Sequence, residues 1–365
     1  KNPDMQGKKT MEQNIDGIRY FWIEGNEYHG NGVGRIKNML SFICGLYKYK
    51  DEIAAEGKPN AVIASSTYPL DIYPAHKMAK KYGSRLIYEV HDLWPLSPIE
   101  LGGMNPHHPY IMMMQSAENY CYKHSDYVVS LLPCSKEHMV EHGLKPEKFV
   151  CIPNGIVKAD WEKPMSDPPV YFDKLKKYHD EGYFLIGYTG AHGIANALDS
   201  FVEAGEKLRD KKIKLLLIGP GPERERLVQK VIDMNLGDTV ELLEPVKRGQ
   251  VPELLNQMDA LYVGLQRQPL FRFGVSPNKL MDYMMAAKPV IFAIEAGNDM
   301  VADADCGISI PPEDSSAIAE AAIKLSSLSK EELTKIGQRG KEYILRNNEY
   351  DVLSKKFLDV FSMPF

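Results

Sequence analysis

The chain lacks several features that would place it in a common class of proteins. No apolar run among its 365 residues approaches the roughly 20 residues that a membrane-spanning helix needs. Its five cysteines, at positions 44, 121, 134, 151 and 306, form no Cys-x-x-Cys pair and no metal-type spacing, which fits a reducing cytosol. Positive charge is not in excess, and the formal net charge of −5 argues against a nucleic-acid binder. The absence of a Walker lysine motif and of a Gly-x-Ser-x-Gly elbow disfavours a P-loop NTPase and an α/β-hydrolase.

The chain does contain a series of short apolar runs, each followed by a turn and a helical pattern. In the first half these runs cover residues 61–65, 85–91, 127–132 and 149–152. In the second half they cover residues 183–189, 213–219, 240–244, 260–265, 289–293 and 307–310. Strands that alternate with helices predict parallel sheets covered on both faces. We therefore expect an α/β fold with two doubly wound, Rossmann-like domains.

The expected linker between these domains is the polar, proline-bearing stretch 157–180. The predicted domains cover residues 1–156 and 181–345. The first strand candidate, 18–23, is half polar, whereas an α/β domain usually opens with an apolar strand. We therefore expect the native first strand of the first domain to precede residue 1.

One predicted helix carries a lysine where a cation is unfavourable. Ser276 suits the N-cap and Pro277 the first helical position, and the helix should stop before Pro289. Lys279 then lies in the first turn, where the helix dipole disfavours a cation and free N–H groups attract anions. An anion above the helix explains this lysine, and Asp282 follows three residues later on the same face. The alternative is a surface pair of Lys279 and Asp282.

Polar residues also follow a strand of the first domain, where ligands of such sheets bind. His91, Asp92 and Trp94 lie just after the run 85–91 or at its end, and are placed for ligand contact or proton handling. A structural histidine is the alternative. Glu89 precedes His91 by two residues, but a metal site is disfavoured because no third ligand accompanies them.

Three loops of the second domain offer contacts to an anion. Gly190 and His192 lie in a loop that leads into a helix, which suits phosphate, although a plain strand-to-helix turn has the same pattern. Arg224 begins a helix after a further strand, where it reaches either a ligand or solvent. Arg267 and Arg272 come shortly before the helix of Lys279, and guanidinium groups bind phosphate bidentately.

The order of the motifs resembles one enzyme family. The segments EVHDLWP, IPNGI, GYTGAHGIAN, LLIGPGPERERL, FGVSPNKLMDYMMAAKPVI and CGISIPPED are similar to the retaining, nucleotide-sugar-dependent glycosyltransferases of family 4. The resemblance implies the GT-B architecture, in which two Rossmann-like domains face each other across a cleft. Within the family, the chain looks most like bacterial transferases that build capsule, O-antigen and exopolysaccharide, including the fucosamine-transferring type. By the same likeness, the final helix within 346–365 crosses back to the first domain.

The resemblance assigns roles to residues of this chain. Asp282 matches the second carboxylate of the Glu-x7-Glu motif, which holds the ribose of the donor, and Lys279 matches a catalytic lysine that faces the diphosphate. His91 is similar to the catalytic histidine near the transferred sugar. Val246 and Lys247 look like the segment that meets the base. The implied donor site also includes Gly190, His192, Arg224, Arg267, Arg272 and Ser276, with Asp92 and Trp94 on the acceptor side.

The chain departs from the family pattern at two places. Gly274 stands eight residues before Asp282, so the first carboxylate of the motif is absent and the second is shortened. The basic residues that many members carry after the first strand of the second domain are replaced within 191–196. Neutralisation of the diphosphate then falls to Lys279, Arg267 or Arg272.

The resemblance implies retaining transfer of a hexose or N-acetylhexosamine from a UDP-sugar to a glycan or polyprenyl-linked acceptor in bacterial surface polysaccharide synthesis. No cofactor or metal and no nucleic-acid partner is expected, and the expected location is the cytoplasm. A UDP-sugar epimerase of the same architecture and a non-catalytic nucleotide-sugar-binding subunit are the alternatives. The helical stretch 35–49 suits either a peripheral position on the inner membrane face or, more commonly, packing on the core.

Overall fold

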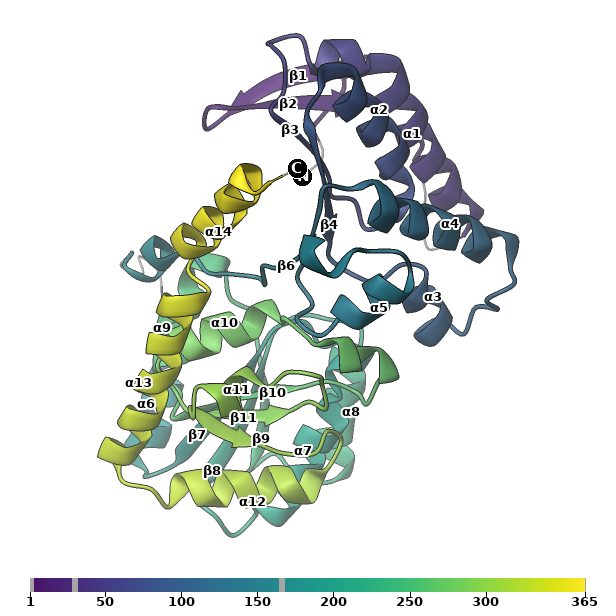
Figure 1. The fold of residues 1–365 in the computed structure, drawn as a ribbon. Coiled ribbons are helices and arrows are strands. Elements are labelled where there is room, and N and C mark those ends of the chain that lie inside the picture. Colours follow the sequence, from purple (N-terminus) through teal and green to yellow (C-terminus); the bar gives the residue numbers. More distant parts are fainter. Residues whose placement is uncertain (1–2, 28–31, 164–167, 365) are drawn as a thin grey trace. The chain divides into compact units, whose positions relative to one another are not determined.

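The computed structural model describes residues 3–27, 32–163 and 168–364, which divide into two compact units (Figure 1). Unit 1 comprises residues 1–130, 136–151 and 360–365. Unit 2 comprises residues 131–135 and 152–359. Both are α/β units built around a parallel sheet, which confirms the predicted fold class.

Unit 1 contains a parallel sheet and a separate antiparallel hairpin. The parallel sheet has the spatial order β3 (Ala61–Ala64), β4 (Arg85–Val90), β5 (Tyr127–Ser130), β6 (Phe149–Cys151). The hairpin joins β1 (Thr10–Ile15) to β2 (Ile18–Ile23). The predicted strand 18–23 is therefore present, but it pairs with β1 outside the parallel sheet.

The helices of unit 1 are α1 (Val33–Ile53), α2 (Ile72–Tyr82), α3 (Leu96–Glu100), α4 (Pro109–His124) and α5 (Lys136–Glu141), with short 3-10 turns η1 (Pro69–Asp71) and η2 (Pro146–Lys148).

Unit 2 is built on a six-stranded parallel sheet. Its spatial order is β12 (Gly307–Ser309), β11 (Val290–Ala293), β10 (Ala260–Gly264), β7 (Phe184–Thr189), β8 (Ile213–Ile218), β9 (Val240–Leu243). The helices are α6 (Phe172–Asp180), α7 (Leu198–Lys207), α8 (Arg224–Asp233), α9 (Val251–Asn256), α10 (Asn278–Met285), α11 (Met300–Asp303), α12 (Ser315–Ser326), α13 (Lys330–Asn347) and α14 (Tyr350–Ser362), of which the part from Val360 onward is counted with unit 1. Short 3-10 turns are η3 (Lys158–Trp161), η4 (Ile194–Asn196), η5 (Arg248–Gln250) and η6 (Pro269–Phe273).

The sheet of unit 2 separates two hydrophobic layers. Successive side chains of a strand point to opposite faces, so Leu216 joins one cluster while Leu215 and Leu217 join the other. Side chains of α6, α9, α10, α11 and α13 complete the first cluster, and those of α7, α8 and α12 complete the second. Burial on both faces explains why these strands read as continuous apolar runs.

Helix α1 places part of its apolar stripe in the core. Met39 and Ile43 are buried against Leu70 of η1 and Met114 of α4. On the same stripe Leu40 and Tyr47 remain exposed. Across the described residues, no helix is both long and apolar enough to cross a bilayer.

The segments predicted as linker and final helix take part in the two units. The predicted linker 157–180 contains η3 and α6, and Leu175 of α6 is fully buried in the core of unit 2. The second half of that stretch is thus structural and not a free connection. At the end of the chain, Arg85 donates to the carbonyl of Met363 (2.6 Å) and the Tyr127 hydroxyl donates to that of Pro364 (2.8 Å).

Candidate functional site

Two glycine-bearing loops interlock at the carboxyl ends of β7 and β8. The Gly190 N–H donates to the carbonyl of Ile218 (3.0 Å), and the His192 N–H donates to that of Pro220 (2.7 Å). Gly190 and Gly219 have φ values of +143° and +151°, and a Cβ on Gly219 would lie 2.0 Å from the Gly190 oxygen. Only glycine tolerates this approach. The loops are therefore fixed together at the edge where open α/β sheets bind ligands.

Lys279 projects from the first turn of α10 toward these loops. Its ammonium donates to Tyr188 Oη (2.8 Å) and Asn196 Oδ1 (2.6 Å), and lies 4.4 Å from the centre of the Tyr188 ring. Burial lowers the pKa of Lys279 to about 8. Both partners are neutral, and in the described part of the chain no carboxylate lies within ion-pair distance of this ammonium. A desolvated cation without a counter-charge, at a helix N-terminus, is suited to bind an anion.

The start of α10 differs from the prediction by one residue. Ser276 does not cap the helix; Pro277 occupies the N-cap position and Asn278 begins the helix. The Ser276 hydroxyl instead accepts from the N–H of Asn154 (3.0 Å), whose side-chain amide donates to the Ser276 carbonyl (2.8 Å). This distant partner occupies the hydroxyl that would otherwise cap α10.

Asp282 is held by an arginine that the sequence reading did not single out. Arg248 in η5 forms a bidentate bridge to the nearly buried Asp282 carboxylate, with distances of 2.5 and 2.8 Å. The predicted alternative of a Lys279–Asp282 surface pair is wrong, because each side chain has other partners. Asp282 raises the pKa of Arg248 through this hydrogen bonding. The signal in the sequence was the basic pair Lys247-Arg248 after β9, but its pairing with α10 spans 34 residues.

His192 is a buried polar side chain without hydrogen bonds. Its ring is fully buried, and neither nitrogen has a hydrogen-bond partner among the described residues. Burial, together with the charges of Arg224 and Lys279, lowers its pKa to about 4. The ring is therefore neutral near pH 7. Unpaired buried polar groups cost free energy, and such groups often belong to functional sites.

The other predicted cations of unit 2 have partners of their own. Arg224 donates to Glu244 Oε1 (2.7 Å) and bridges α8 to the end of β9. Arg267 pairs with Glu295 at the surface (3.0 Å). The exposed Arg272 donates to the Pro269 carbonyl (2.7 Å), and its guanidinium lies 4.2 Å from the Phe273 ring centre. Among the described residues, no interaction joins Arg267 to Lys279. The two residues are close in sequence, but their side chains do not form one cluster of cations.

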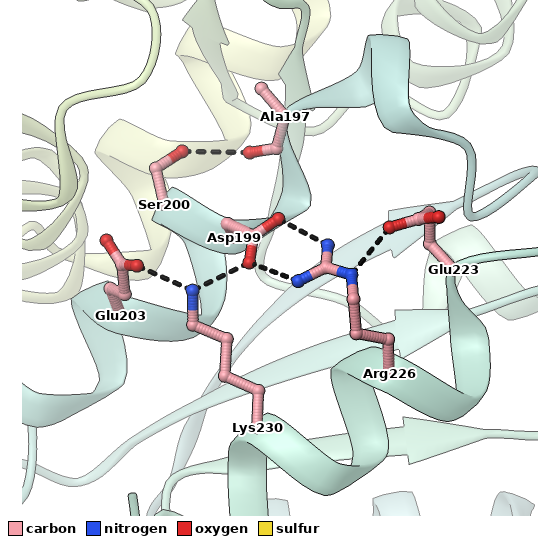
Figure 2. A network of polar contacts seen from close by, with 7 residues as sticks. All are labelled: Ala197, Asp199, Ser200, Glu203, Glu223, Arg226 and Lys230. Carbon is pink, nitrogen blue, oxygen red and sulfur yellow. Dashed lines mark hydrogen bonds and ion pairs between the residues drawn. The ribbon is translucent and has the colours of Figure 1, made fainter.

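A charged network beside these loops fixes α8 against α7 (Figure 2). Arg226 bridges Asp199 bidentately and also contacts Glu223, while Lys230 joins Asp199 to Glu203. Arg226 and Lys230 hold the pKa of Asp199 well below its usual range. The network positions the N-terminus of α8, including Arg224, and occupies the guanidinium of Arg226.

The predicted base-binding segment lies between β9 and α9. Val246 packs against the core of unit 2. The Lys247 N–H donates to Gln250 Oε1 (2.8 Å) and so begins η5. This turn also carries Arg248, which places the segment next to Asp282.

Gly274 has no room for the carboxylate that the family motif carries. Its φ is +94°, and a Cβ there would lie 2.6 Å from Pro133 Cδ and 3.0 Å from Asn298 Oδ1. Any side chain at this position would meet both neighbours. The absence of the first motif carboxylate is therefore built into the local backbone.

In unit 1, His91 forms a cluster with Glu89 and Ser65. The Ser65 hydroxyl donates to Glu89 Oε2 (2.5 Å) and lies 3.1 Å from His91 Nε2, which is 3.6 Å from Glu89 Oε2. Glu89 raises the pKa of His91. Ser65 was not singled out in the sequence, although it directly follows β3. No third metal-ligand side chain joins Glu89 and His91 in the described part of unit 1.

The residues predicted on the acceptor side follow His91. Asp92 is exposed, and Trp94 is half-buried. The Arg35 guanidinium lies 5.4 Å from the centre of the Trp94 ring. Trp94 therefore has an aromatic face that a cation already occupies.

Two family models match the chain one after the other. The model described as glycosyl transferase 4-like domain matches residues 7–155, and the one described as glycosyl transferases group 1 matches residues 183–327. A search among curated proteins finds no significant match.

Similar solved structures are two-domain GT-B proteins. Sucrose-phosphate synthase from Thermosynechococcus elongatus superposes with a TM-score of 0.71 at 16% identity, over 98% of this chain and 86% of that one. A glycosyltransferase from Rickettsia africae gives 0.68 at 16% identity, over 92% and 83% of the two chains. HepE of Anabaena, in complex with UDP and glucose, gives 0.65 at 14% identity, over 93% and 85%. At identities this low, the superpositions show the fold alone, and that fold is GT-B.

Proposed function

We propose that this chain, which is a family 4-like glycosyltransferase of GT-B architecture, transfers a hexose or N-acetylhexosamine from a UDP-sugar. The proposed acceptor is a glycan or polyprenyl-linked sugar of bacterial surface polysaccharide, and the proposed stereochemical course is retention. Catalysis at the inner face of the cytoplasmic membrane belongs to the same proposal. Leu40 and Tyr47 on α1 are exposed apolar side chains, and in this proposal they contact the membrane surface.

The observation that carries this proposal is the environment of Lys279. A diphosphate brings the negative charge that this half-buried ammonium lacks, and the N-terminus of α10 adds its dipole at the same place. The HepE structure, which is similar in fold, contains UDP and glucose. The diphosphate leaves with additional negative charge during transfer. A fixed cation stabilises that charge without reorganisation of solvent.

Asp282 can still hold a ribose while Arg248 remains in place. A carboxylate offers about four lone-pair sites, and a bidentate arginine uses two of them. The remaining sites can accept from the two ribose hydroxyls. Arg248 would then orient the carboxylate, and the neighbouring Val246 and Lys247 would meet the base.

Two features bear on the chemistry. Lys279 supplies the positive charge that a metal ion provides in other transferases, so we propose a metal-independent reaction. His91 is proposed to contact the transferred sugar, with its ring held by Ser65 and Glu89. We propose front-face attack of the acceptor, because Asp282, the carboxylate of the proposed donor site, is already bridged by Arg248; trapping of a glycosyl-enzyme adduct would contradict it.

The test is calorimetric titration with UDP, GDP and ADP. Asp282→Asn keeps the shape of the side chain and removes its charge, so selective UDP binding should weaken at least tenfold. Glu241→Gln is the matched control, since Glu241 is a part-buried carboxylate of unit 2 bonded to Tyr178 and outside the site. UDP binding that is indifferent to Asp282, or absent in the wild type, would refute this donor site.

A further inference from the structure

Three side chains of metal-ligand type converge in unit 1, outside the residues assigned above. They are Glu118 of α4, His138 of α5 and His142, which follows the end of α5. One ligand atom from each lies within 4.8 Å of the other two. Among the described residues, this is the one group of three histidine, cysteine or acidic side chains with such spacing.

The two histidines are arranged as a pair of ligands. They lie one helical turn apart, and their ring centres are 4.2 Å apart. His142 Nδ1 lies 2.8 Å from the carbonyl of His138. Because a carbonyl only accepts, Nδ1 carries the proton and the lone pair of the neutral ring is on Nε2. A backbone carbonyl that fixes the tautomer in this way is a common support for a metal-bound histidine.

Glu118 is a buried carboxylate without a lysine or arginine partner in the described part of the chain. Its side chain is 1% exposed. It accepts from the Tyr122 hydroxyl (2.9 Å) and from the Gln115 amide (2.6 Å), and its Oε1 lies 3.3 Å from His138 Nε2. Burying a charge without a compensating positive charge is costly. The neutral donors Tyr122 and Gln115 orient the carboxylate but do not supply that charge.

We propose that Glu118, His138 and His142 bind a divalent zinc-type cation. Two imidazoles and one carboxylate are a three-protein-ligand set that zinc accepts, with water in the fourth position. Bond lengths near 2.0–2.1 Å place tetrahedral ligand atoms about 3.3 Å apart. The Glu118–His138 pair already has this separation, at 3.3 Å. The ion clamps the end of α5 to α4 and takes no part in sugar transfer.

The experiment uses the full chain, stripped of metal with a chelator and titrated with ZnCl₂ in a calorimeter. We expect one zinc ion per chain, and a loss of affinity of at least tenfold in His138→Gln and in His142→Gln. His76→Gln is the matched control, because His76 is a part-buried histidine of unit 1 that bonds to Tyr120 and lies outside the cluster. Cobalt provides a second readout, since a tetrahedral Co²⁺ site gives intense visible absorption.

The outcomes separate clearly. Stoichiometric zinc binding that is lost in both ligand variants and kept in His76→Gln supports the site. Zinc binding unchanged by both variants, or no binding at micromolar zinc, overturns it. If His138→Gln fails to fold in the absence of metal, His142→Gln decides. Circular dichroism and the Tm of the metal-free variants check that each one folds.

Discussion

Replacing Lys279 with methionine should weaken UDP binding and remove its dependence on pH. Methionine keeps most of the apolar stem while it removes the ammonium that faces the loop of Gly190. A hydrogen bond to a charged group contributes about 1.5–3 kcal/mol. With one decade for each 1.4 kcal/mol, the loss of affinity should be roughly 10- to 150-fold.

The pH dependence follows from the pKa of about 8 that burial gives Lys279. Below this pH the ammonium is charged and binding is at its strongest. Above it the donor-free protein loses the proton, and affinity should fall by up to about tenfold per pH unit. The diphosphate of UDP keeps nearly the same charge in this range, because the second ionisation of a phosphate lies near pH 6. Calorimetry between pH 7 and 9 should therefore show a decline in the wild type that Lys279→Met lacks.

The stability of the free protein should change in the opposite sense. Lys279 has a lower pKa in the folded state than its ordinary value of 10.5, so the unfolded chain binds more protons between these two values. The free energy of unfolding therefore rises with pH from about 8 toward 10.5 on account of this group. Urea unfolding should show that rise in the wild type and lack this contribution in Lys279→Met.

Lys288→Met is the matched control for these measurements. Lys288 is another half-buried lysine whose pKa is lowered by burial, and it donates to the Asn256 carbonyl (3.0 Å) just beyond α10. Its replacement should leave the affinity for UDP and the pH profile of binding unchanged. Wild-type affinity and a wild-type pH profile in Lys279→Met would refute the assignment of Lys279 to the diphosphate.

Three further predictions concern neighbouring contacts. Arg248→Ala should destabilise the protein by about 1–2 kcal/mol in urea unfolding, because the nearly buried Asp282 loses its partner; additivity with Asp282→Ala would contradict the coupling. Gly274→Ala should cost about 1–3 kcal/mol, since φ is +94° and the new Cβ meets Pro133; an unchanged Tm would show that the backbone adapts. Glu89→Gln should lower the pKa of His91 in an NMR titration, because Glu89 raises it; an unchanged pKa would mean that the cluster is not formed in solution.

Much of the fold could be predicted because strands of parallel sheets are buried on both faces. The run 213–219 became β8, with every residue from Ile213 to Ile218 buried. Strand β1 was missed because it is polar and mostly exposed, so it carries no apolar pattern. The strand of residues 18–23 was predicted. Its pairing with β1 was not, because the polar residues of β1 do not indicate a strand with which it could form a hairpin.

The site was predictable where a residue type alone carries the signal, as at Gly190 and Lys279. Its pairings were not, because they join residues that lie far apart in the sequence. Lys279 bonds to Tyr188 across 91 residues, and Asn154 takes the Ser276 hydroxyl across 122 residues. Local propensity predicted Ser276 as the N-cap, but its hydroxyl accepts a hydrogen bond from the distant Asn154 and does not cap α10. Such competition between local and tertiary hydrogen bonds cannot be read from spacing.

The most direct test of the proposed activity is an assay of UDP release. The wild-type chain would be incubated with a panel of UDP-hexoses and UDP-N-acetylhexosamines, with and without polyprenyl-diphosphate-linked sugars as acceptors, in the presence of a chelator. We expect UDP release that requires an acceptor, gives a retained anomeric configuration and disappears in Lys279→Met but not in Lys288→Met. An isomerised UDP-sugar formed without acceptor would identify an epimerase, and UDP-sugar binding without turnover on any acceptor would identify a binding subunit; either result would contradict a glycosyl transfer reaction.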